Sequence, residues 1–272
     1  AAGILMMAQY GLLEVYNGEN AQADAGQSGV TKTEIHSDAE DVCAKLAAER
    51  LSTQTVSDFS RSTMFPFALG GLVAAQILVH GEHKPENSAE AWIAKNVRGI
   101  IFLGTPFRGS SVAKPAEVVR RVLDFFGVDT QQQTLKLLGV DSERLDELTR
   151  AFPQVLNKRR SSKNIDRRIE AFFFYETLKT SWGIGSVQIV ETESAQLHGC
   201  GDAAPIRADH IGICKFETKD ADGYVTVVAA IRKAMIPPGI SPSNGGRIIN
   251  ILGKAVNVAN DSISIGSQVN NL

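Results

Sequence analysis

The sequence predicts an α/β fold in which helices cover both faces of a mainly parallel sheet. Two continuous apolar runs, 97–104 and 169–176, are typical of strands buried on both faces of such a sheet. Helical patterns alternate with these strands, as in a parallel arrangement. The segment 65–75 joins a strand end, a glycine-containing turn and a helix of small and aliphatic residues. We expect incomplete strands at the N-terminus and a C-terminal tail outside the fold.

The composition limits the classes of partner. The 272 residues are 43% hydrophobic and 21% charged, which is ordinary for a globular protein. A net charge of −2 gives no overall attraction to nucleic acid or to a membrane surface. Three cysteines without metal-ligand spacing favour a reducing, intracellular setting, and we expect a cytoplasmic location. No apolar run reaches the ~18 residues that a transmembrane helix needs, and residues 1–10 lack the basic start of a signal peptide.

Changes in composition divide the chain into four parts. Residues 1–36 are a poorly determined N-terminal segment, in which 11–16 could be a strand. The α/β domain is expected at 37–236. A linker rich in proline, glycine and serine follows at 237–246, and a tail with few charges occupies 247–272.

Periodicity places the elements within the domain. Strands are expected at 64–67, 97–104, 169–176 and 186–190. Helices are expected at 37–50, 70–79, 89–95 and 224–235, with three more between 113 and 157 separated by Gly127 and Gly139. His80 and His83 are placed in a loop. The basic run 158–160 is interpreted as a solvated face, with a phosphate-binding patch as the alternative.

The strand–turn–helix at 65–75 is the context of a nucleophile elbow. In that motif, Gly-x-Ser-x-Gly, a strained turn holds a serine above the edge of the sheet. The corresponding residues here run from Pro66 to Gly70, and the nucleophile position is Ala68. The residue after it, Leu69, is the candidate for the oxyanion hole. The sequence therefore predicts the scaffold of a serine hydrolase without its reactive hydroxyl group.

Two further residues complete the order of a catalytic triad. In α/β hydrolases the nucleophile, acid and histidine follow one another along the chain, and Ala68, Glu176 and His210 stand in that order. Glu176 ends a predicted strand and His210 lies in a later loop. A strand-terminal charge and a plain loop histidine are the alternative interpretations. Four other carboxylates are candidates for the acid; Asp202 and Asp209 are alternatives, whereas Glu191 and Glu193 fit the order less well.

Several motifs in order resemble a known family. They lie at 68–73, 102–110, 173–176, 193–195 and 208–216. Together they resemble fungal lipase-like serine esterases, relatives of the SERAC1-type α/β hydrolases found as effector domains of fungal NLR-like immune receptors. The resemblance covers roughly residues 68–235. It implies an α/β-hydrolase-like fold, with Glu176 as acid and His210 as base.

The chain departs from the family pattern in two places. The elbow has alanine where the family has serine. A His-Gly-type loop that helps form the oxyanion hole is not recognisable in residues 1–60. Because an alanine methyl group cannot replace an attacking hydroxyl, activity is in doubt.

The tail resembles, more weakly, the amyloid signalling motifs of fungal effectors. Short β-prone pieces alternate with glycine and asparagine, and charges are few. A disordered tail and a strand docked on the domain are the alternatives. The resemblance implies an NLR-like receptor as partner through 247–272.

Three functions follow. The first is a degenerate esterase-like domain with a signalling tail. The second is an active ester or lipid hydrolase whose serine is obscured by a faulty gene model near 56–67. The third is a catalytically dead binding module for an acyl ester or lipid. No cofactor, metal or nucleic acid is expected for any of them.

Overall fold

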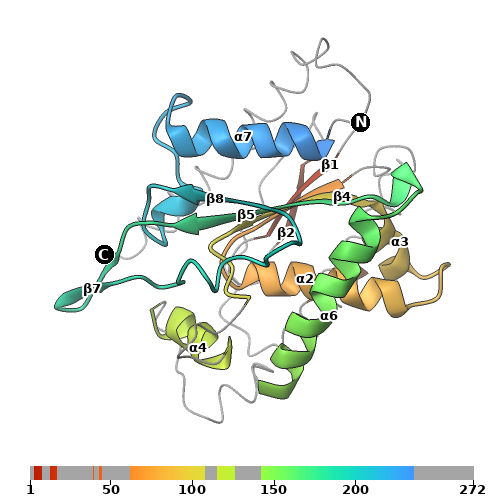
Figure 1. Cartoon of the computed structure of the whole chain (residues 1–272), viewed down its shortest axis with the longest axis horizontal. Helices are drawn as coiled ribbons and strands as arrows, with labels where there is room; N and C mark the ends of the chain where they lie inside the picture. The colour runs from red at the N-terminus through yellow and green to blue at the C-terminus, as the bar shows by residue number, and fades with distance from the viewer. Residues whose placement is uncertain are drawn as a thin grey trace.

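A mainly parallel sheet forms the centre of the molecule (Figure 1). The computed structural model describes residues 3–7, 13–16, 39, 43–44, 62–107, 115–125 and 142–235. Within these ranges six strands form one sheet in the order β2-β1-β3-β4-β5-β8. They are β1 (Gly3–Met7), β2 (Leu13–Tyr16), β3 (Ser62–Pro66), β4 (Val97–Leu103), β5 (Glu170–Glu176) and β8 (Asp202–Ile206). Every neighbouring pair is parallel except β1 and β2, so the predicted sheet is confirmed.

Helices cover both faces of this sheet. α7 (Asp222–Met235) contacts β3, β4 and β5 from one side. On the other side α2 (Gly70–His83) packs against α3 (Ala89–Asn96) and α6 (Ser142–Arg160), and α4 (Pro115–Phe125) packs against α6. Figure 1 shows α7 above the sheet and α2, α3 and α6 below it. The molecule therefore has an α/β-hydrolase-like fold, as the sequence predicts.

The strands β4 and β5 are mostly apolar because both of their faces are buried. Side chains alternate between the faces of a strand. On β4, Ile100 and Phe102 belong to the core beneath α2 and α6, whereas Ile101 belongs to the core beneath α7. The neighbouring Phe173 of β5 stacks on Phe102 with ring centroids 5.1 Å apart. Burial of each such ring stabilises the fold by roughly 1.5–3 kcal/mol.

The strand predicted at 186–190 does not belong to this sheet. That stretch begins in β7 (Gly185–Val187), which among the described strands pairs only with β6 (Thr180–Trp182), in a two-stranded hairpin. The next strand of the main sheet is instead β8, which the sequence analysis missed. β8 contains Asp202 and Pro205 and lies at the edge of the sheet, where such residues are tolerated.

Other elements follow the prediction with shifted ends. The strand expected at 11–16 is confirmed as β2, whereas β1 was not predicted. α2 continues through His80 and His83, which were wrongly placed in a loop. Of the helices expected between 113 and 157, α4 and α6 are present, and residues 126–141 lie outside the described residues. The helix expected at 37–50 is helical at its three described residues, 39, 43 and 44.

The linker 237–246 and the tail 247–272 also lie outside the described residues. The four-part division of the chain therefore stays a prediction.

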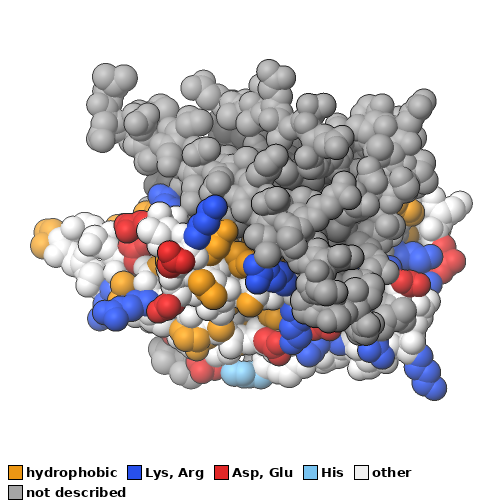
Figure 2. Space-filling model, turned by 90° about the horizontal axis from the view of Figure 1, so that it is seen from above, with side chains coloured by type: hydrophobic (Ala, Val, Ile, Leu, Met, Phe, Trp, Pro, Cys, Tyr) orange, Lys and Arg blue, Asp and Glu red, His pale blue; other side chains and the backbone are white. Residues whose placement is uncertain are grey.

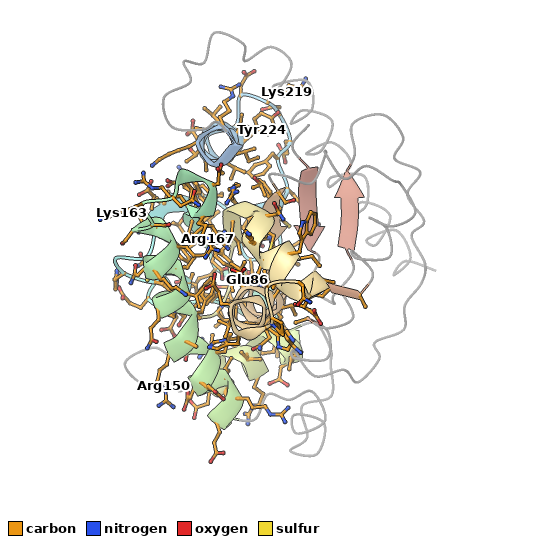
Figure 3. All side chains as sticks on the ribbon, turned by 90° about the vertical axis from the view of Figure 1, so that its right-hand side faces the viewer. Glu86, Arg150, Lys163, Arg167, Lys219 and Tyr224 are labelled. Carbon is orange, nitrogen blue, oxygen red and sulfur yellow. The ribbon has the colours of Figure 1, made fainter. Side chains whose placement is uncertain are left out.

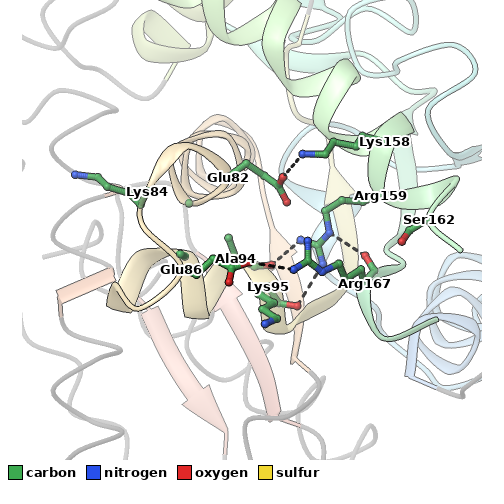
Figure 4. A pocket seen from close by; sticks show the side chains of 11 residues that line it. Glu82, Lys84, Glu86, Ala94, Lys95, Lys158, Arg159, Ser162 and Arg167 are labelled. Atoms are coloured by element: carbon green, nitrogen blue, oxygen red, sulfur yellow. Dashed lines mark hydrogen bonds and ion pairs between the residues drawn. The ribbon is translucent and has the colours of Figure 1, made fainter. Parts of the chain in front are cut away.

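One residue of the basic run is buried, against expectation. Arg159 on α6 is only 4% exposed. Its guanidinium donates to the carbonyl oxygens of Ala94 at 2.5 Å, Val97 at 2.6 Å and Arg167 at 3.0 Å (Figure 4). Burial lowers the pKa of Arg159 to about 10, so the group is still charged at pH 7. Arg159 ties α6 to the end of α3 and the start of β4.

The neighbouring charged residues are paired at the surface. Lys158 forms an ion pair with Glu82 at 2.9 Å, and Arg167 forms one with Glu86 at 3.3 Å. Figure 3, which views this amino edge of the sheet, shows Arg167 and Glu86 close together. A cavity of about 160 Å³ lies beside them. The phosphate-binding alternative stays a prediction.

Candidate active site

The carboxyl ends of four parallel strands bring the predicted site residues to one edge of the sheet. Ala68 follows β3, Gly104 follows β4, Glu176 ends β5 and His210 follows β8. These strands are neighbours in the sheet, in that order. Residues up to 142 positions apart in the sequence therefore meet at this edge, because parallel strands all end on the same side.

Ala68 occupies a strained turn between β3 and α2. Its φ of +47° is the one positive φ among the described non-glycine residues. Its N–H donates to the carbonyl of Leu103 at 2.9 Å, which ties the turn to the end of β4. Leu69 is the N-cap of α2 and has no side-chain cap. A left-handed alanine costs of order 1–3 kcal/mol, so the surrounding structure must hold it there.

Two backbone hydrogen bonds and one close approach to a neighbouring loop hold this turn. The N–H groups of Gly70 and Gly71 donate to the carbonyls of Phe67 and Ala68 at 2.9 and 3.1 Å. A Cβ at Gly71 would overlap the side chain of Thr105, so only glycine lets the start of α2 approach the loop after β4.

Glu176 and His210 form a buried acid–base pair. Both side chains are 0% exposed, and the His210 Nδ1 lies 2.6 Å from Glu176 Oε2. The backbone N–H of Val190 donates to Oε1 of the same carboxylate at 2.9 Å. The backbone N–H of His210 donates to the hydroxyl of Thr180 at 3.0 Å. Both residues are therefore positioned by hydrogen bonds from segments outside the main sheet.

The imidazole of His210 lies between the strained turn and the end of β4. The ring of Phe67, which precedes Ala68, lies 5.2 Å from it between centroids. On another side Gly104 has φ +59°, and a Cβ there would lie 3.2 Å from the imidazole ring. Phe125 of α4 contacts the same ring edge-on at 6.3 Å.

Ala68 and the carboxylate share one neighbouring residue, Val190. Ala68 belongs to one apolar cluster with Val190, whose N–H binds Glu176. A carboxylate that holds an imidazole in this way fixes the ring's orientation and tautomer, as in a catalytic triad. The assignment of Ala68 as the nucleophile position of such a triad stays a prediction.

The alternative acids have other partners. Asp202 pairs with Lys233 at 2.7 Å, and the Oδ1 of Asp209 accepts from Gly212 N at 2.7 Å in the 3-10 helix η2 (Gly212–Cys214). Glu191 pairs with Arg121 and Glu193 with His198, at 3.3 and 3.2 Å. Of the five candidate carboxylates, Glu176 is the one the structure brings to His210.

Sequence reasoning missed three contributors to the site. Thr180 and Val190 hold the pair from the hairpin and from the loop after it, and no motif marks them. Gly104 does carry a signal, because a glycine that ends a buried strand indicates a special backbone conformation or a close approach. The residues after β1, 8–12, where an oxyanion-hole loop would lie, are outside the described residues.

Two kinds of feature are absent from the described part of the chain. No helix there is both long and apolar enough to cross a bilayer. Within the same ranges, no three His, Cys, Asp or Glu side chains gather as metal ligands.

The fold and this edge of the sheet define a hydrolase-like α/β protein. Comparison with known proteins agrees: the chain is 32% identical to human protein SERAC1 over 169 residues, which is 62% of this chain and 23% of that protein. It is 32% identical to mouse SERAC1 over 58% of this chain and 21% of that protein, and 29% identical to zebrafish SERAC1 over 62% and 23%. The chain thus spans less than a quarter of the length of the curated relatives it matches.

No protein-family model matches the chain. A solved structure of a lipase-esterase related protein from Clostridium acetobutylicum aligns over 86% of this chain and 91% of that one, with 11% identity and a TM-score of 0.36. The chain is thus similar to SERAC1 in sequence, and its sheet topology is α/β-hydrolase-like.

Proposed function

We propose that this chain is a serine-esterase-like domain whose nucleophile has been replaced by Ala68. Glu176 and His210 are its remaining acid and base, and the N–H of Leu69 is a donor of its oxyanion hole. The observation that carries the proposal is the left-handed backbone of Ala68 at the end of β3. Alanine gains nothing from this conformation, whereas a serine there would be presented at the edge where His210 lies.

The wild-type chain is expected to lack esterase activity. Acyl transfer by a triad needs a hydroxyl whose proton passes to the imidazole as the oxygen attacks the carbonyl carbon. The methyl group of Ala68 has neither a lone pair nor an acidic proton. Binding of an acyl ester or lipid at this edge does not need the hydroxyl and would be retained.

Restoring the hydroxyl tests the proposal. Wild type should neither label with a fluorophosphonate probe nor hydrolyse short-chain p-nitrophenyl esters above background. Ala68→Ser should do both, because a serine adds one oxygen to a side chain whose backbone is already in place. Adding His210→Ala to Ala68→Ser should lower kcat by about 10,000-fold or more. His198→Ala is the matched control, since His198 forms a similar pair with Glu193 that is exposed at the surface.

The other outcomes separate the alternatives. Labelling of a serine in the wild-type chain would support an active hydrolase with a nucleophile elsewhere, and would contradict the loss of function. A folded Ala68→Ser variant that stays inert, but binds an acyl-ester analogue, would support a binding module without an intact oxyanion hole. Transcript sequencing across 50–68 would show whether the alanine results from a gene-model error.

We further propose that the domain is an effector in fungal NLR-type signalling, with residues 247–272 as the segment that engages an NLR-like receptor. The composition of the tail supports this, since it combines β-prone triplets with asparagine and glycine and has few charges. A synthetic 247–272 peptide should assemble into fibrils with a cross-β diffraction pattern and seed fresh peptide. A peptide that stays monomeric at high concentration would contradict this role.

A further inference from the structure

Exposed apolar side chains gather around the edge that carries His210. Among the described residues, five large hydrophobic side chains are exposed; they are Leu178, Trp182, Ile184, Ile211 and Val225. Single exposed hydrophobics are common on protein surfaces, whereas grouped ones mark interaction sites. The first four lie in the segments that follow β5 and β8. A hydrogen bond joins these two segments directly, since the N–H of Leu178 donates to the carbonyl of Ala208 at 3.1 Å.

The most exposed of these residues stands at the tip of the β6–β7 hairpin. Trp182 pairs with Gly185, which leaves Gly183 and Ile184 as a two-residue turn. The φ of +60° at Gly183 suits the first position of a type II′ turn. No atom lies within 4 Å of a Cβ built at Gly183 or Gly185, and Ile184 is fully exposed. The tip therefore projects into solvent, as Figure 1 shows for β7.

The base of the hairpin is anchored to the site. Thr180 accepts a hydrogen bond from the backbone N–H of His210. The ring of Trp182 packs edge-on against Phe125 at 6.1 Å, and Phe125 contacts His210. An isolated two-stranded hairpin has little stability in water. These contacts hold the tip at a defined place beside the acid–base pair.

The charge of the hairpin segment suggests what it meets. Residues 177–190 contain one charged residue, the exposed Lys179, and no carboxylate. A tryptophan and a bulky aliphatic side chain beside a lysine is the combination that anchors proteins at the headgroup level of membranes. Figure 2 shows hydrophobic side chains at the projecting end of the molecule, with side chains of both charges behind them.

We propose that the β6–β7 hairpin docks the domain onto a bilayer that contains anionic phospholipid. Ile184 and Trp182 enter the headgroup region, and Lys179 lies at the phosphates. The net charge of −2 does not oppose this, because charges farther away than the Debye length of about 8 Å are screened at physiological salt. Docking would turn the edge with Glu176 and His210 toward the lipid, whether or not the nucleophile is present.

Flotation of the full chain with vesicles tests this inference without reference to hydrolysis. The vesicles are phosphatidylcholine alone and a 7:3 mixture of phosphatidylcholine and phosphatidylserine. Wild type should float with the mixed vesicles. Ile184→Ser should lower the bound fraction about tenfold without loss of fold, because Ile184 is fully exposed. The matched control is Val225→Ser on α7, an exposed apolar residue outside the hairpin, which should leave binding unchanged.

A charge reversal tests the choice of lipid. Lys179→Glu should weaken binding to the mixed vesicles by about fivefold or more, while Lys163→Glu, between α6 and β5, should not. Absence of binding by wild type, or an equal loss with Val225→Ser, would overturn the inference. So would a wild-type dimer that Ile184→Ser converts to a monomer while vesicle binding is unaffected, since the hairpin would then join two copies. None of these results bears on the proposal for Ala68, because that proposal is tested by ester hydrolysis and not by vesicle binding.

Discussion

The two edges of the sheet both bury ionisable side chains, but they satisfy them in different ways. At the amino edge Arg159 donates to backbone carbonyls of α3, β4 and η1 (Ile165–Arg167). At the carboxyl edge Glu176 accepts from one backbone N–H and meets a second ionisable side chain, His210. The first arrangement joins elements of the fold. The second links an acid to a base, which is the arrangement that proton transfer needs.

The comparison shows that burial of a charge is not by itself a sign of chemistry. Arg159 remains a cation at pH 7, and each of its partners is a main-chain oxygen that cannot titrate. The partners of Glu176 include an imidazole beside a strained turn. The identity of the partners, and not the degree of burial, separates a structural cluster from a candidate active site.

The largest expected effect is at the carboxyl edge. In the Ala68→Ser background, Glu176→Gln should lower kcat by about 10,000-fold, because an amide cannot hold the imidazole in the productive tautomer. Rates of p-nitrophenyl ester hydrolysis measure it. Glu193→Gln, which disturbs the exposed pair with His198, is the control and should leave the rate unchanged. Equal rates for Glu176→Gln and its parent would remove the distinction between the two edges.

At the amino edge the effect should be on stability alone. Arg159→Met should lower the free energy of unfolding by about 3–5 kcal/mol, because several buried carbonyl oxygens lose their donors. Urea denaturation followed by circular dichroism measures it. Lys158→Met removes an adjacent cation whose ion pair is exposed to solvent and should cost less than about 1 kcal/mol. If Arg159→Met costs no more than Lys158→Met, Arg159 is not a structural tie.

A third ionisable group sharpens the comparison: the thiol of Cys214, whose hydrogen bond goes to the main-chain carbonyl of Ile211 at 3.4 Å. Burial raises the pKa of the Cys214 thiol to about 11, so the thiol stays neutral where Arg159 stays charged. The thiolate is the reactive form, and a rise from the ordinary value of 9.0 lowers its fraction at pH 8 roughly 100-fold. Alkylation of Cys214 by iodoacetamide should be slower than that of N-acetylcysteine by about this factor. Mass spectrometry of the tryptic peptide measures it, and similar rates would contradict the assignment.

The smallest expected effect separates backbone strain from contact with the imidazole. Gly104 and Gly183 have nearly the same positive φ, +59° and +60°. Alanine at either position is strained by about 1–2 kcal/mol. At Gly104 the new Cβ would also press on His210 at 3.2 Å, whereas the space around Gly183 is open. Gly104→Ala should therefore be the more destabilising change in thermal unfolding, and equal losses would mean that the ring moves freely.

Much of the fold could be predicted from particular stretches of sequence. β4 and β5 each contain an unbroken apolar stretch, 99–103 and 171–174, so burial on both faces could be predicted from composition. β8 was missed because a short edge strand with a proline and an aspartate has no such pattern. The prediction of a strand at 186–190 was wrong for the opposite reason. This stretch has the composition of a strand, but Ile189 and Val190 are buried in an apolar cluster outside any sheet.

The sequence by itself determined the types and order of the site residues, an alanine at an elbow followed by a glutamate that ends a strand and a histidine in a later loop. It favoured Glu176 among five carboxylates but did not show that this carboxylate meets the imidazole, and it did not separate Arg159 from the two basic residues beside it. Only the tertiary structure did so. Strand order and the return of loops to one edge determine which side chains meet, and those contacts depend on residues more than thirty positions apart.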